Sequence, residues 1–381
     1  MDISQTIERR MAMDELLENM DQPRKPRKWK RGILIAVCVI LALLLIAAAC
    51  IGAYVNHLLG QMNYVDPSTE VTVPPAEQES LDMDDPGMET IDPEVDESLP
   101  SIEDMTFPSE PEESEPEPEP EEPQGNYINI LLIGQDRRPG EGRQRSDAMI
   151  LVTFHMDAKT VTLTSFMRDQ YVQIPGYKPN KLNAAYQYGG MKLLNKTLKT
   201  NFGVRVDGDI EVDFGQFERI VDLLGGVEIK LTDSEAIVLN NRGHWGFTAG
   251  KTVLNGEQAL IYSRIRYIDS DYRRAERQRK VMLSLIDRYK SQSITEMLGL
   301  LDDILPMVTT NMKKNEIVDL VWDIAPILAT AKFNSMRIPV DGSFDQGTVK
   351  VREGLKNWFQ YNIDFAENRQ VLREIFETGN P

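Results

Sequence analysis

The sequence predicts an α/β protein: a layered α-β-α domain with a central mixed sheet, preceded by one transmembrane helix and a disordered linker. Three observations predict this organisation. A charge-free apolar run, 33–55, follows a basic N-terminal tail. An acidic, proline-rich stretch occupies 57–125. From 126 to 381, short apolar runs alternate with amphipathic stretches, which is typical of strands and helices in a layered domain.

The apolar run 33–55 is long enough to cross a membrane. At 1.5 Å per residue a helix of this length spans about 34 Å. Six Lys or Arg residues stand just before it, between 24 and 31. Such a flank predicts a cytoplasmic tail at 1–31, a span at 32–56 and everything later outside the cell membrane. A lipoprotein cleavage box ending at Cys50 is the alternative, but the apolar run continues past that residue.

The acidic stretch accounts for the net charge of −18. Residues 61–125 hold 22 of the 60 Asp and Glu residues and no Lys or Arg, so the rest of the chain carries 38 acidic against 42 basic residues. A stretch with few apolar residues and one sign of charge cannot build a core. We therefore expect 57–125 to be a solvated spacer that holds the domain away from the membrane.

Cysteine and histidine usage excludes several kinds of chemistry. Both cysteines, Cys38 and Cys50, lie in the apolar run, so the domain has no thiol nucleophile and no cysteine-ligated zinc. The three histidines are scattered, which does not suggest a Ser-His-Asp triad. No nucleic-acid-binding signature is present, and an extracytoplasmic domain would meet no nucleic acid.

Within the domain, the pattern predicts an alternating series of elements. Strands are expected at 128–133, 148–154 and 161–166, the last two joined by a turn around Asp157, and a further strand at 227–231. Helices are expected from Gly189 to about Thr200, at 214–224, at 254–260 and at 271–290. The remainder, to Phe376, is expected to be mostly helical with one possible strand at 335–339.

An arginine-rich stretch follows the helix expected at 254–260. Arg264 and Arg266 project from one face if 262–267 is extended. Arg274 and Gln278 stand four residues apart on the next helix, in line with the apolar Val281, Met282 and Leu285, whereas Arg273 and Arg279 are expected to diverge toward solvent. The alternative is a solvated basic helix start. Arginines oppose the helix dipole there unless an anion is bound, and their forks suit phosphate oxygens, so the stretch predicts a phosphate site.

Two aspartates flank the first loop of the domain. Asp136 follows the first strand, and Asp147 precedes the second. If these strands are antiparallel neighbours, both carboxylates lie at one end of the sheet. Mg²⁺ commonly takes one or two carboxylates together with phosphate oxygens. Each aspartate alone is more ordinarily a turn or capping residue, but the surrounding arginines and the later Arg168 and Lys181 favour a metal site.

Seven blocks of this sequence, in order, resemble the LytR–CpsA–Psr family. They are NILLIGQD (129–136), RSDAMILV (145–152), SFMRD (165–169), KLNAAY (181–186), LLGGVEI (223–229), LNGEQALIYSRIR (254–266) and the D-x-x-R-x-x-R-Q series that ends at Gln278. The basic tail, the single span and the external domain also fit. Arg273 departs from the pattern, because the family commonly has glycine there.

The resemblance implies an enzyme that moves a glycopolymer, such as a teichoic acid or capsular polysaccharide, from a polyprenyl-diphosphate carrier to peptidoglycan. It implies Mg²⁺ held by Asp136 and Asp147, and a cleft for the lipid tail. Carried over by motif, the catalytic candidates are Asp147, Arg168, Arg264, Arg266, Asp271, Arg274 and Gln278. Arg145 and Lys181 are lesser candidates for the diphosphate, and Asp147 is the candidate proton acceptor. A regulator that binds lipid-linked polymer without turnover, or a lipid-diphosphate hydrolase, remains the alternative.

Overall fold

The structure, a computed structural model, describes residues 52–83, 85, 87–91, 99–105, 123–137, 142–266, 268, 271–328 and 330–381. The tail and most of the expected membrane span lie outside these residues. Within the described part of the chain, no helix is both long and apolar enough to cross a membrane. Contacts divide the chain into two units, Met1–His57 and Leu58–Pro381, and the sheet, its helices and the smaller lobe all belong to the second.

A seven-stranded mixed sheet forms the centre of this unit, in the order β1-β11-β8-β3-β4-β5-β12. β3 lies antiparallel to β4 and parallel to β8, and β5 is antiparallel to β4 and parallel to β12. The strands are β1 (Asn63–Tyr64), β3 (Tyr127–Gln135), β4 (Ser146–His155), β5 (Thr160–Phe166), β8 (Gly208–Asp213), β11 (Thr309–Thr310) and β12 (Lys332–Ile338). The three strands expected first are confirmed, each one to two residues longer at an end.

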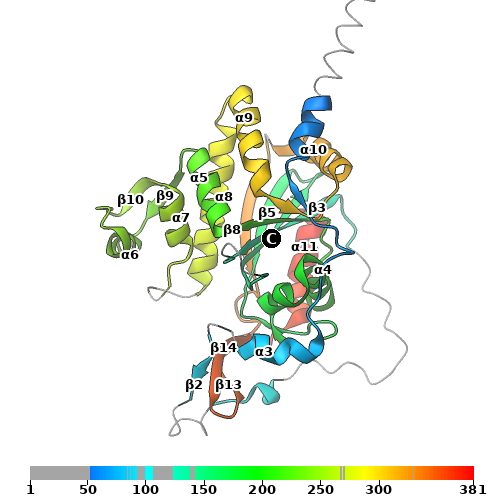
Figure 1. Cartoon of the computed structure of the whole chain (residues 1–381), viewed down its shortest axis with the longest axis vertical. Coiled ribbons are helices and arrows are strands. Elements are labelled where there is room, and N and C mark those ends of the chain that lie inside the picture. Colours follow the sequence, from blue (N-terminus) through cyan, green and yellow to red (C-terminus); the bar gives the residue numbers. More distant parts are fainter. Residues whose placement is uncertain are drawn as a thin grey trace, which may run out of the picture. The chain divides into compact units, whose positions relative to one another are not determined.

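Helices cover both faces of this sheet, as Figure 1 shows. Alternate residues of β3 and β4, such as Leu131 and Met149, pack with α4 (Leu182–Phe202) and α11 (Phe365–Thr378). The opposite face, with Ile150 and Leu163, packs against α8 (Asp271–Lys290). Because side chains of a strand alternate between faces, both layers draw their cores from the same strands. The layered α-β-α arrangement with a mixed sheet is confirmed.

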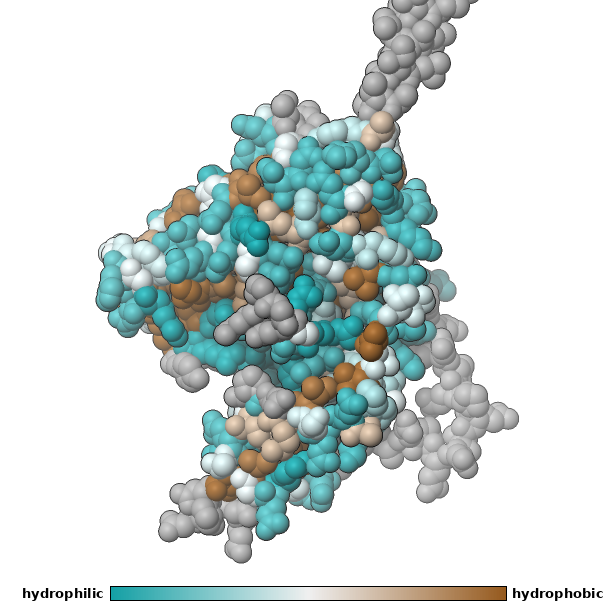
Figure 2. Space-filling model, viewed as in Figure 1, coloured by the Kyte–Doolittle hydropathy of each residue, from teal (hydrophilic) through white to brown (hydrophobic). Residues whose placement is uncertain are grey.

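A smaller lobe with its own core stands beside α8 (Figure 1). Its strands are β9 (Val227–Leu231) and β10 (Gly250–Leu254), and its helices are α5 (Phe214–Leu223), α6 (Asp233–Gly243) and α7 (Gly256–Ser263). Each of these helices begins with a reciprocal capping box, which fixes its first residue. In Figure 2 apolar residues gather in a hollow where Figure 1 places α7, while hydrophilic residues cover most of the visible face.

Two regions hold more structure than expected. The helix expected from Gly189 is the second part of α4, and a further helical part from Leu182 precedes it; the two parts meet at a kink, where Gly190 adopts φ 65°. The region expected to be mostly helical does contain α9 (Ile294–Ile304) and α10 (Lys314–Leu328), but also the hairpin of β13 (Asp345–Arg352) and β14 (Leu355–Tyr361). A turn with Gly354 at φ 72° joins its strands, and Val349 and Phe359 face a small core.

The acidic stretch is not a plain spacer where the structure describes it. Its described residues form β1, η1 (Pro75–Glu77), α3 (Gln78–Met83), β2 (Glu89–Thr90) and η3 (Ile102–Asp104). β1 pairs with β11 at the edge of the sheet, β2 pairs with β14, and Leu58, Ile91 and Met105 are buried. Composition alone misses this, because the opposite charges that hold the stretch come from the domain. Residues 106–122 lie outside the described residues.

Candidate active site

A cavity of about 250 Å³ lies between one face of the sheet and helices α5, α7 and α8. Its walls are mostly apolar, with Leu132, Ala148, Ile150, Ile210, Val212, Phe214, Phe217, Ile220, Leu260, Val281, Met282, Leu285 and Val308 among them. Polar side chains also line it: Asp147, Ser263, Arg264, Arg266, Arg274 and Gln278. The structure thus brings five of the expected site residues to one apolar cavity. It also identifies the apolar side chains that line the cavity, which could not be identified from the sequence.

The two aspartates lie at the same end of the sheet, because β3 and β4 are antiparallel neighbours. Gly134 pairs with Ala148 but Gln135 pairs with Ser146, so Asp147 is the extra residue of a bulge. A bulge turns its side chain out of the regular alternation, and Asp147 faces the cavity. Asp136 follows the last residue of β3 directly.

Each aspartate is paired with one of the expected site arginines. Asp136 Oδ2 lies 3.2 Å from Arg264 Nη2, and Asp147 Oδ1 lies 2.7 Å from Arg168 Nη1. The Arg264 guanidinium also stands 4.4 Å from the centre of the Phe214 ring, within cation–π range. Arg168 therefore reaches the site through Asp147 and is not itself part of the cavity lining.

Asp136 and Asp147 offer the kind of oxygen ligands that Mg²⁺ accepts. Among the described residues, no group of three or more Asp, Glu, His or Cys side chains is placed to hold a metal. Two carboxylates at one sheet end are, however, what Mg²⁺ uses when phosphate oxygens and waters complete its octahedron. Asp136 and Asp147 are the residues that would hold it.

The arginine-rich stretch takes a different backbone path from the one expected. Tyr262 belongs to α7, and Arg264 ends that helix with φ −107° and ψ 3°, so 262–267 does not begin as a strand. Arg264 and Arg266 both line the cavity nonetheless. Arg274 and Gln278 also line it, together with the apolar residues that follow them on α8, as their spacing predicts.

Arg273 and Arg279 were both expected in solvent, and only Arg273 is exposed. Arg279 is buried and donates a 2.8 Å hydrogen bond from Nη1 to Ser165 Oγ on β5. Burial lowers its pKa to about 10. The expectation failed because α8 is covered on two sides, by the sheet and by the lobe, so that more than one stripe of the helix is buried.

Arg277, the second arginine of the D-x-x-R-x-x-R-Q series, was given no role from the sequence. Its guanidinium is 2% exposed, lies 3.4 Å from Glu235 Oε1 and donates a 2.9 Å hydrogen bond to the carbonyl oxygen of Ile265. Ile265 stands between Arg264 and Arg266. Arg277 therefore fixes the backbone that carries two cavity arginines, a role that no spacing in the sequence reveals.

Asp271 is the first residue of α8. Its side chain lies outside the described residues, so its expected part in orienting the arginines stays a prediction.

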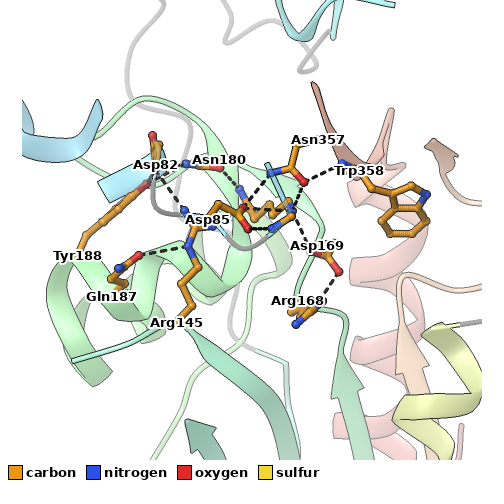
Figure 3. Close-up of polar contacts among 12 residues, drawn as sticks. Asp82, Asp85, Arg145, Arg168, Asp169, Asn180, Gln187, Tyr188, Asn357 and Trp358 are labelled. Atoms are coloured by element: carbon orange, nitrogen blue, oxygen red, sulfur yellow. Dashed lines mark hydrogen bonds and ion pairs between the residues drawn. The ribbon is translucent and has the colours of Figure 1, made fainter. Parts of the chain in front are cut away.

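Arg145 and Lys181 do not line the cavity, contrary to expectation. Both belong to a polar network that includes Asp82 of α3, and Figure 3 shows Arg145 in this network beside Asp85. Arg145 Nη1 lies 3.1 Å from Asp85 and its Nη2 3.4 Å from Asp82, while Lys181 Nζ lies 3.2 Å from both Asp85 and Asp169. The acidic stretch thus supplies carboxylates where the resemblance implied substrate phosphates.

Asp169 links this network to the cavity. Its Oδ2 lies 3.0 Å from Arg168 Nε, the guanidinium that also binds Asp147. Burial alone would raise the pKa of Asp169, but the charges of Arg168 and Lys181 outweigh it and lower the pKa to about 2. The backbone supports the same arrangement, because the amide groups of Leu182 and Asn183 at the start of α4 donate to the carbonyl oxygens of Gln170 and Arg168.

The family model LytR_cpsA_psr matches residues 101–363, more than half of the chain. The chain belongs to the LytR_cpsA_psr family.

Named relatives within this family are transferases. The chain is 29% identical over 327 residues to the polyisoprenyl-teichoic acid–peptidoglycan teichoic acid transferase TagT of Bacillus subtilis, covering 84% of this chain and 88% of TagT. It is 36% identical over 256 residues to the corresponding transferase TagU of Enterococcus faecalis, covering 65% of this chain and 78% of TagU.

Solved structures of family members share the fold. TagT bound to LI-WTA superposes with a TM-score of 0.53 at 27% identity, over 66% of this chain and 89% of TagT. TagT with bound octaprenyl pyrophosphate lipid gives a TM-score of 0.50 at 26% identity, over 67% of this chain and 92% of that chain.

Proposed function

We propose that this LytR_cpsA_psr protein is a phosphotransferase that moves a teichoic acid or capsule-like glycopolymer from a polyprenyl-diphosphate carrier to a hydroxyl of peptidoglycan. One observation carries the proposal: an apolar cavity that is also lined by Arg264, Arg266 and Arg274. A prenyl chain suits apolar walls, and a diphosphate suits convergent guanidinium groups. The teichoic acid transferases among the relatives, and the TagT structure with octaprenyl pyrophosphate lipid, support the same substrate class.

The residues divide the chemistry between them. Arg264, Arg266, Arg274 and Gln278 would hold the diphosphate, and their positive charge would offset the charge that repels an oxygen nucleophile. Mg²⁺ held by Asp136 and Asp147 would supply further charge neutralisation. The peptidoglycan hydroxyl forms a bond to the phosphorus that bears the polymer, the bond from that phosphorus to the bridging oxygen breaks, and polyprenyl phosphate leaves. Asp147 is the candidate to accept the proton of the hydroxyl.

The proposal includes a membrane anchor. The expected single span at 32–56, with the tail 1–31 in the cytoplasm and the catalytic domain outside, would keep the protein at the surface where its lipid carrier resides. Support for it comes from the apolar run and its basic flank in the sequence.

Release of polyprenyl phosphate, measured with and without acceptor glycan, tests the reaction. A transferase releases it only with the acceptor, a hydrolase releases it in both cases, and a binding module without turnover releases none. Arg266→Ala should lower the rate by roughly 10²–10³, as for loss of one preorganised charge donor. Arg273→Ala is the matched control, because Arg273 is exposed and pairs with Glu276 on the helix surface. Parental rates in the Arg266 variant would refute the assignment of the site.

A further inference from the structure

A row of paired charges connects the acidic stretch to the cavity. It starts in the docked segment, defined as residues 78–83, 85 and 87–91, which comprises α3, Asp85 and β2. Asp85 Oδ2 lies 3.2 Å from Lys181 Nζ, which lies 3.2 Å from Asp169 Oδ1. Asp169 Oδ2 lies 3.0 Å from Arg168 Nε, and Arg168 Nη1 lies 2.7 Å from Asp147 Oδ1. Figure 3 labels three members of this row, Asp85, Asp169 and Arg168.

Lys181 and Asp169, in the middle of the row, are buried, and Asp85 at its start has little of its side chain exposed. The side chains of Asp85, Lys181 and Asp169 are 9%, 5% and 8% exposed. A buried charge is tolerated only where opposite charges and hydrogen bonds surround it, so removal of one member leaves its partner uncompensated. These contacts therefore fix positions, unlike exposed ion pairs, which contribute little.

Asp85 is the centre of the segment's attachment. Besides Lys181 it binds Arg145 at 3.1 Å and accepts a 3.0 Å hydrogen bond from Asn357 Nδ2 on β14. Lys181 Nζ in turn donates to Asn357 Oδ1 at 2.8 Å. Asp85 is thus held by groups from three separate parts of the domain.

We propose that the docked segment is a positioning element of the active site, in which Asp85 fixes Lys181 and, through Asp169, orients Arg168 against Asp147. The inference rests on the proposed function. Without the Asp85 carboxylate, Lys181 keeps one acidic partner in the row, Asp169. Lys181 then competes with Arg168 for Asp169, and the guanidinium beside Asp147 loses its fixed orientation. Asp85 touches no substrate in this scheme and acts only through other residues.

The test uses the full chain reconstituted in lipid vesicles, with Asp85→Asn as the variant. Its matched control is Glu79→Gln, because Glu79 belongs to α3 in the same docked segment, pairs with the exposed Arg352 and lies outside the row. Binding of farnesyl diphosphate in MgCl₂ is measured by calorimetry, and polymer transfer is measured in parallel. We expect Asp85→Asn to lose about 10–100-fold in either quantity, the range for residues that orient a metal or phosphate ligand, and Glu79→Gln to lose nothing.

A second substitution separates positioning from general stabilisation. In an Asp169→Asn background the row is already cut, so Asp85→Asn should add less than about threefold. A purely structural role would give the same penalty in both backgrounds. If Asp85→Asn fails to fold, Asp85→Glu replaces it, because it keeps the charge and displaces the carboxylate by one methylene.

The outcomes distinguish the inference from the proposed function. A parental chain that neither binds farnesyl diphosphate nor transfers polymer would sink the proposed function. A parental chain that does both, with Asp85→Asn unchanged or with its penalty undiminished in the Asp169→Asn background, would overturn the positioning role alone.

Discussion

The guanidinium of Arg277 donates a 2.9 Å hydrogen bond to the carbonyl oxygen of Ile265, the residue between the cavity arginines Arg264 and Arg266. Nη1 of the same guanidinium faces Oε1 of Glu235 at the start of α6. The other carboxylate oxygen of Glu235 accepts a hydrogen bond from the backbone amide of Thr232. One buried side chain on α8 therefore joins the lobe to the backbone that carries two cavity arginines.

Arg277→Met should weaken both stability and catalysis. Loss of one partner of a buried ion pair costs about 3–5 kcal/mol, and displacement of the arginines by an ångström can cost about 10²-fold in rate. Adding Glu235→Gln removes the unpaired charge, so the double variant should regain stability but not kcat/KM. Chemical unfolding and transfer kinetics measure the two effects, and parallel recovery of both would show that Arg277 only stabilises the fold.

Asp169 should make stability depend on pH in the acid range. Its folded-state pKa of about 2 lies below the usual 3.8. A lowered pKa stabilises the fold fully above the unfolded value, and the contribution is lost as the pH falls from about 4 toward 2. The stability difference between the parental chain and Asp169→Asn should therefore be constant above about pH 5 and shrink below pH 4. Urea unfolding across this range decides, and a difference that does not vary with pH contradicts the prediction.

Asp136→Asn and Asp147→Asn should each raise the MgCl₂ concentration needed for half-maximal transfer by at least about tenfold, since even outer partners of a metal site contribute 10–100-fold. Removal of divalent ions with a chelator should stop transfer, and Mg²⁺ should restore it. Asp207→Asn serves as the control, because Asp207 pairs with the exposed Arg205. Transfer that persists in the chelator would exclude a required metal.

Ala148→Leu should weaken binding of the lipid tail and leave binding of the diphosphate unchanged. Ala148 lines the cavity, and a larger side chain there occupies space that about two tail carbons would fill. At about 0.8 kcal/mol per buried CH₂, affinity for a long-chain prenyl diphosphate should fall roughly tenfold, while affinity for inorganic diphosphate should hold. Equal losses for both ligands would show that the cavity does not receive the tail.

Much of the site could be predicted from the sequence because it follows from short-range periodicity. The i, i+4 spacing put Arg274 and Gln278 on one line, and the strand–loop–strand pattern put Asp136 and Asp147 at one sheet end. The fold was predictable to a similar extent, since the central strands and α8 were predicted correctly. β13 and β14 were not predicted, because their pairing and the turn between them identify them more clearly than their composition does.

The rest depends on partners distant in the sequence. Arg279 is buried because the sheet and the lobe enclose α8, and periodicity on one helix cannot show two covering layers. Arg145 and Lys181 meet Asp85, about 60 and 96 residues away, and composition assigned that aspartate to a spacer. Charge counted along the chain hid these pairs, because each acid binds a base from another segment.

The docking of the acidic stretch limits how this protein can be shortened. The family match starts at residue 101, yet a chain begun there would lack β1, leaving the polar backbone edge of β11 uncovered, a site for unwanted strand pairing. It would also lack Asp82 and Asp85, so Arg145 would lose both acids that it binds, and Lys181 would lose one of its two. A cut after His57 keeps both features, so a shortened form of the enzyme should begin there.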